Sequence, residues 1–101
     1  MMPDAVLTRT QDGFSVQGSA MFDNVIALRY EGEKLLTQHF ANNKTATINF
    51  SHFQDHNPTS FSLLLCWMRF AKKMNGEITW VNLPLSMKRM GKMFGWDLYH
   101  G

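Results

Sequence analysis

Residues 45–81 read TATINFSHFQDHNPTSFSLLLCWMRFAKKMNGEITWV, and this stretch predicts a strand, a loop, a helix, a turn and a second strand. Its first six residues alternate, with Ala46, Ile48 and Phe50 on one face and polar residues on the other. Alternation of this kind, with β-branched residues, is typical of a half-buried strand. Residues 51–58 are polar and rich in turn formers, which predicts a loop that ends at a proline.

The segment after Pro58 predicts a helix that is apolar almost all round. Its thin polar stripe consists of Ser62, Cys66, Arg69 and Lys73, at spacings of four, three and four. A helix of this kind must be covered on more than one side, either by its own sheet and neighbouring helices or in part by another protein. We expect Thr59 or Ser60 to cap its start, and Asn75-Gly76 to end it.

The residues before this stretch predict a hairpin followed by a helix. Residues 5–10 and 14–18 are strand-like and are separated by an Asp-Gly turn, so we expect two edge strands. From residue 21 the apolar period becomes helical, and one face carries Phe22, Val25, Leu28, Gly32, Leu35 and His39. Glycine inside a helix costs about 1 kcal/mol relative to alanine, so Gly32 suggests a close approach of this helix to the sheet.

The residues after this stretch predict one more helix. An apolar stripe of Leu83, Met87, Met90 and Phe94 indicates a helix from residue 85 to 94. Trp96 to Tyr99 would add a final short strand or pack across the end of the sheet. The whole chain, residues 1–101, is therefore expected to be a single α/β domain: a mixed sheet of four to five strands with about three helices mainly on one face.

Composition narrows the class of function. The net charge of +2 is too small to imply nucleic acid, although the basic excess lies in residues 51–101. A single cysteine fits a reducing compartment. No apolar run approaches the roughly 20 residues of a membrane span. The first residues lack the features of a signal peptide. We expect a cytoplasmic protein that reaches the inner membrane, if at all, through a partner.

No residues form an obvious catalytic set. His52 and His56 lie four apart with Asp55 nearby, but in a predicted loop and without a suitably spaced third ligand, so we expect no metal. Cys66 lies among apolar neighbours and is interpreted as structural. No glycine-rich phosphate-binding loop is present. We therefore expect no catalytic residue, no cofactor and no enzymatic activity.

The cluster Thr59, Ser60 and Ser62 is the most informative polar feature. These hydroxyls can serve as helix caps. At an exposed helix N-terminus they can also meet a phosphate or a polar group of a partner, because free amides and the helix dipole favour negative charge there. The two roles are compatible.

The run Asn57-Pro58-Thr59-Ser60-Phe61-Ser62-Leu63-Leu64-Leu65, with Ala71-Lys72-Lys73 and Gly76 after it, resembles the STAS domains of sulphate transporters and anti-sigma-factor antagonists. The resemblance covers about residues 5–98. The sequence departs from the family where an Asp is replaced by Asn57, the first hydroxyl by Pro58 and a Gly by Ser60. These departures make a kinase-regulated switch less expected than a constitutive binding module.

Within the family, the leucine-rich helix and its Ala-Lys-Lys end are most similar to the small cytoplasmic subunit of the ABC transporter that maintains lipid asymmetry in the Gram-negative outer membrane. The resemblance implies a non-catalytic module that binds the ATPase subunit. The alternative is an anti-sigma-factor antagonist, with Thr59 or Ser60 as phospho-acceptor and an anti-sigma factor kinase as partner. The expected partner interface consists of Asp55, His56, Asn57, Pro58, Thr59, Ser60, Phe61, Ser62, Arg69, Lys88 and Lys92.

Overall fold

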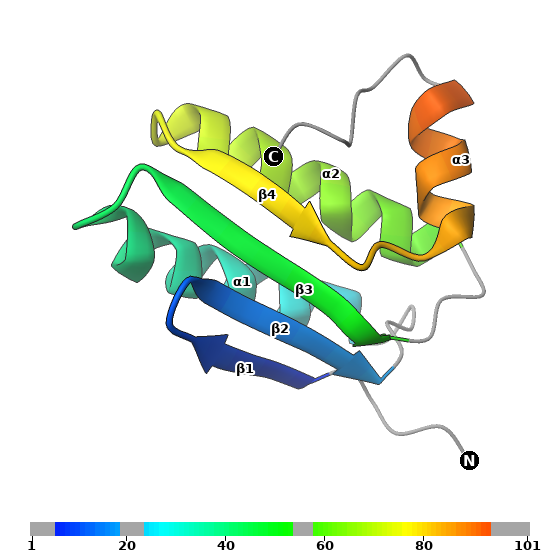
Figure 1. Cartoon of the computed structure of the whole chain (residues 1–101), viewed down its shortest axis with the longest axis horizontal. Helices are drawn as coiled ribbons and strands as arrows, with labels where there is room; N and C mark the ends of the chain where they lie inside the picture. The colour runs from blue at the N-terminus through cyan, green and yellow to red at the C-terminus, as the bar shows by residue number, and fades with distance from the viewer. Residues whose placement is uncertain (1–5, 19–23, 54–57, 94–101) are drawn as a thin grey trace.

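A computed structural model describes residues 6–18, 24–53 and 58–93, with side chains described except at 51–60, 90 and 93. The elements follow one another as β1 (Val6–Thr10), β2 (Gly13–Gly18), α1 (Val25–Phe40), β3 (Thr45–Phe53), α2 (Pro58–Lys73), β4 (Glu77–Val81) and α3 (Leu85–Met93). The strands form one sheet in the order β1-β2-β3-β4 (Figure 1). β1 runs antiparallel to β2, whereas β2, β3 and β4 are parallel. This is the mixed α/β sheet that the sequence predicts.

The two long helices cover one face of this sheet. In Figure 1, α1 and α2 lie behind the strands. Ala46, Ile48 and Phe50 of β3 are at most 2% exposed and belong to the core, as predicted from their alternation. The opposite face carries small polar side chains, among them Thr8, Ser15, Thr47, Asn49 and Thr79. No described helix covers that face.

The hairpin is confirmed, but of its two strands only β1 lies at an edge of the sheet. β2 pairs with β1 on one side and, in parallel, with β3 on the other. The amide of Thr47 donates a hydrogen bond to the carbonyl of Asp12 at 2.8 Å, which fixes the start of this pairing. The parallel partner arrives only after α1, so the local sequence of the hairpin carries no sign of it.

The buried face of α1 is rotated from the predicted one. Leu28, Gly32 and Leu36 are buried, whereas Leu35 is only partly buried and His39 is half-exposed. The reason is that α1 packs against α2 as well as against the sheet. The buried face therefore includes the side that meets a second helix, a contact that periodicity alone does not locate.

Two boundaries around the central loop differ from the prediction. β3 continues to Phe53, beyond the predicted end at residue 50. α2 begins at Pro58, so Thr59 and Ser60 lie in its first turn and do not precede it as caps. Proline suits the first helical position because it has no N–H group that would be left unpaired there. Residues 54–57 lie outside the described structure.

The predicted end of α2 is confirmed. Asn75 adopts a left-handed backbone conformation with φ of 58°. The amide of Gly76 donates to the carbonyl of Ala71 at 2.8 Å, and the amide of Asn75 donates to that of Lys72 at 3.1 Å. This pair of hydrogen bonds is a Schellman motif, which satisfies carbonyls at the helix end and turns the chain into β4.

α3 follows the predicted stripe where the structure describes it. Leu83 and Met87 are 7% and 0% exposed and join the core. The side chain of Met90, Phe94 and the predicted segment from Trp96 to Tyr99 lie outside the described residues. Among the described helices, none has the length and apolar character needed to cross a membrane.

Candidate functional site

α2 is the central element, and its burial follows the pattern of its sequence. Ser62, Arg69 and Lys73 are exposed and Cys66 is half-buried, so the predicted polar stripe faces outward. The buried residues are Phe61, Leu63, Leu64, Trp67 and Ala71. They are covered by the sheet, by α1 and by α3, which all pack against α2 or its neighbours. The chain itself therefore covers most of the apolar surface of this helix, and Leu65, Met68 and Phe70 remain partly buried.

Trp67 holds α2 in a defined orientation. Its indole Nε1 donates a hydrogen bond to the carbonyl of Arg29 on α1, at 3.2 Å. Its ring meets Phe14 of β2 edge-on, with centroids 5.2 Å apart and an angle of 84° between the ring planes. Trp67 is fully buried, so these contacts join α2 to both α1 and the sheet.

Gly32 is the reason that Trp67 fits. A Cβ atom on Gly32 would overlap the indole ring of Trp67. The close approach expected of this glycine is therefore real, but its partner is the neighbouring helix and not the sheet. Glycine is required here because any larger residue would push α1 and α2 apart.

The leading end of α2 places hydroxyl residues just after a strand of the sheet. Pro58, Thr59 and Ser60 form the first turn, and no acidic residue is present in it. The first amides of a helix have no partner within the helix and carry partial positive charge. The backbone of this first turn, with the exposed Ser62 next to it, is therefore the part of α2 best suited to a polar or negative group.

One residue predicted to lie in the partner interface, Phe61, is buried in the core. Phe61 is 4% exposed and is part of the core, so it does not supply contact area to a partner. The cause is its position on α2, three residues before Leu64 on the side that faces inward. The neighbouring Ser62 faces outward.

The other predicted interface residues have different settings. Asp55, His56 and Asn57 lie outside the described residues. Arg69 is exposed on α2, Lys92 is exposed on α3 and Lys88 is half-buried there. His52, assigned to a loop from the sequence, belongs to β3. In the part of the chain that the structure describes, no three His, Cys, Asp or Glu residues could hold a metal ion.

α1 presents a feature that the sequence analysis missed. Ile26 and Tyr30 are 67% and 61% exposed, and the guanidinium of Arg29 lies 5.5 Å from the centre of the Tyr30 ring. Arg29 also donates a hydrogen bond to Glu33 at 2.9 Å. This bond is the largest cause that raises the pKa of Arg29, and the electrostatic interaction with Cys66 is the second. The sequence contained a sign of this exposed pair, because Ile26 and Tyr30 are four residues apart and do not belong to the apolar stripe of this helix.

The fold is similar to that of solved proteins of low sequence identity. The anti-sigma factor antagonist SpoIIAA in its unphosphorylated form matches with a TM-score of 0.65 and 16% identity, over 90% of this chain and 80% of that chain. The Bacillus cell fate determinant SpoIIAA in the phosphorylated form matches with a TM-score of 0.67 and 18% identity, over 90% and 83%. No family model and no curated protein sequence matches. The chain has the STAS fold.

Proposed function

We propose that this chain is a non-enzymatic protein-interaction module of MlaB type, which binds the ATPase subunit of a phospholipid-transporting ABC system in the cytoplasm. The observation that carries the proposal is the leading end of α2. Its first turn has hydroxyl residues and no acidic residue, and an exposed polar stripe follows it on a helix whose apolar surface is mostly covered. The exposed Ser62, one residue beyond the buried Phe61, is thus available for a contact that the fold does not need.

The proposed surface has a small set of residues. Pro58, Thr59, Ser60 and Ser62 form its centre, and Arg69 lies farther along the same stripe. The preceding residues Asp55, His56 and Asn57 lead into it in the sequence. Hydrogen bonds from the hydroxyls would fix the orientation of the partner, and the arginine would add charge-assisted contacts. Phe61 has no direct part in it.

The experiment is co-purification of the full chain with the ATPase encoded nearest to it. Ser62→Arg introduces bulk and charge at an exposed position, so the fold is expected to persist while ATPase binding falls at least tenfold. Thr10→Arg, at an exposed position on the edge strand β1, is the matched control and should bind as the unchanged protein does. Equal binding by both variants would remove this surface from the proposal.

The alternative is an anti-sigma-factor antagonist that is switched by phosphorylation of Thr59 or Ser60. It is favoured by the similarity to SpoIIAA, whose structure is known in unphosphorylated and phosphorylated forms. The first turn of α2 would stabilise a phosphate on either residue. Incubation with an anti-sigma factor kinase and intact-mass measurement decides between the two: addition of one phosphate, lost in Thr59→Ala or Ser60→Ala, supports the switch.

A further inference from the structure

α3 has two sides of opposite character. Met87 is fully buried, and it anchors one side of this nine-residue helix in the core. Leu85, Arg89 and Lys92 are spaced by four and three residues, which places them together on the side of α3 opposite Met87. All three are exposed, Leu85 by 61%. With Lys88, α3 has three cations and no carboxylate.

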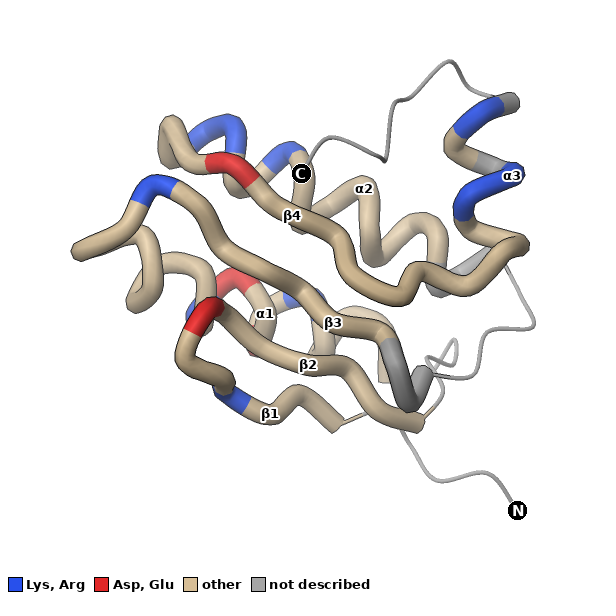
Figure 2. The backbone as a smooth tube through the Cα atoms, viewed as in Figure 1, with Lys and Arg blue, Asp and Glu red and all other residues tan. Residues whose placement is uncertain are grey.

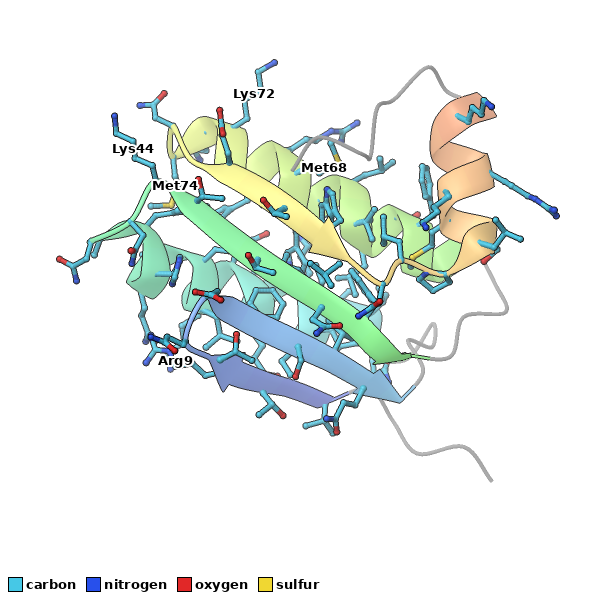
Figure 3. The ribbon with its side chains drawn as sticks, viewed as in Figure 1. Arg9, Lys44, Met68, Lys72 and Met74 are labelled. Carbon is cyan, nitrogen blue, oxygen red and sulfur yellow. The ribbon has the colours of Figure 1, made fainter. Side chains whose placement is uncertain are left out.

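A second basic group lies at the C-terminal end of α2, away from α3 (Figure 2). Lys72 and Lys73 are exposed there. Figure 2 shows Lys and Arg along α3 at one end of the molecule and at the C-terminal end of α2 at the other, both on the β4 side of the sheet. Lys72 extends away from the ribbon, as does Lys44 at the same end of the molecule (Figure 3). Within residues 58–93 the sole carboxylate is that of Glu77.

The distribution of these charges indicates which class of binding partner fits them. Protein interfaces usually depend on central aromatic or arginine anchors in desolvated pockets, whereas these cations are distributed over two helices. A nucleic-acid backbone would match the cations but would give no gain from an exposed leucine. An anionic lipid surface is negative over a wide area and accepts an apolar side chain at the boundary between headgroups and acyl chains.

We propose that the exposed side of α3, together with the C-terminal end of α2, contacts an anionic phospholipid surface, with Leu85 entering the headgroup region. This contact leaves the first turn of α2 for a protein partner and does not depend on the identity of that partner. One leucine on a helix of nine residues gives weak, reversible binding. Each Lys or Arg near such a surface strengthens binding about fivefold, and salt reduces the effect.

The experiment uses the full chain alone and vesicles of phosphatidylcholine with about one third phosphatidylglycerol, in co-sedimentation at low and high salt. Binding is expected at low salt and is expected to fall at high salt. The double variant R89E/K92E should bind at least tenfold more weakly. The matched control R9E/K34E has the same net charge, but its changes lie on β1, at the opposite edge of the sheet from β4, and on α1 (Figure 3). It should bind within about threefold of the unchanged protein.

A second variant, Leu85→Gln, tests the lipid-specific element without changing charge. It should weaken vesicle binding severalfold and leave any binding to a duplex DNA probe unchanged. Circular dichroism checks that each variant is folded. The proposal is overturned by absence of vesicle binding at low salt, by equal losses in the two double variants, or by vesicle binding that Leu85→Gln does not alter. None of these results involves the ATPase, so failure here is separate from failure of the proposed partner.

Discussion

Gly32 on α1 lies directly against the indole of Trp67 on α2, with no room between them for a methyl group. The same indole donates its N–H to the carbonyl of Arg29, one turn earlier on α1. The glycine therefore sets the distance between the two helices, and the hydrogen bond sets their rotation. This contact joins the N-terminal half of the chain to the central helix that carries the proposed binding surface.

Substitution of Gly32 by alanine should destabilise the protein. In an ordinary helix this change stabilises by about 1 kcal/mol. Here the added methyl group must displace a fully buried ring, and we expect a net loss of about 2 kcal/mol in the free energy of unfolding, as for other overpacked cores. Urea unfolding followed by tryptophan fluorescence measures it. The smaller ring in Trp67→Phe should reduce the cost of Gly32→Ala; an unchanged cost in that background would contradict the contact.

Two neighbouring residues of β3 should respond very differently to truncation. Ile48 is fully buried beneath the helices, so Ile48→Ala should cost about 3 kcal/mol of unfolding free energy. Thr47 lies on the uncovered face, and Thr47→Ala should cost about 1 kcal/mol or less, mainly through lower strand propensity. Chemical denaturation of both variants gives the comparison. Similar losses would mean that both faces of the sheet are covered.

Asn75 should tolerate glycine better than alanine. Its φ of 58° lies in the left-handed region, where a residue with an ordinary side chain is strained and glycine is not. We expect Asn75→Gly to leave stability unchanged or slightly higher. Asn75→Ala should lower it by about 1 kcal/mol. Thermal unfolding of the two variants at one concentration decides. If Asn75→Ala were as stable as Asn75→Gly, α2 could not end with a left-handed residue at position 75.

Phe61 and Ser62 are adjacent in sequence and should have separate effects. Phe61→Ala removes a core side chain and should cost about 3 kcal/mol of stability. Ser62→Ala removes an exposed hydroxyl and should change stability by less than about 0.5 kcal/mol while weakening binding to the ATPase. Stability comes from urea titration and affinity from calorimetry with the purified ATPase. If Ser62→Ala weakened ATPase binding only as much as it lowered stability, the result would argue against a direct contact between Ser62 and the ATPase.

Local patterns predicted the elements and most of their faces. The alternation through Ile48 and the polar stripe through Ser62 needed only the geometry of a strand and of a helix. The partner of Gly32, by contrast, depends on where α2 lies relative to α1, which is a tertiary relationship. The burial of Leu36 has the same cause, since the second helix widens the buried face of α1.

The site was harder to derive than the fold. The sequence indicated hydroxyls near the start of the central helix, but the helix begins at Pro58, earlier than predicted, and this moves Thr59 and Ser60 into its first turn. The inward position of Phe61 follows from its spacing of three residues from the buried Leu64. Aromatic residues near a suspected interface are attractive candidates, yet a single phase shift along a helix exchanges an exposed residue for a buried one.

The order of the strands in space is the order in which the ribosome makes them. Each new strand adds to an edge that the preceding residues have already formed, and no later strand must be inserted between two earlier ones. The β1–β2 hairpin joins segments close in the chain, whereas each parallel pairing must wait for a crossover helix, since Gly13 pairs with Thr47 and Thr45 with Glu77. We expect the sheet to grow during translation, one edge at a time, with each edge open until the next crossover helix and strand have been made.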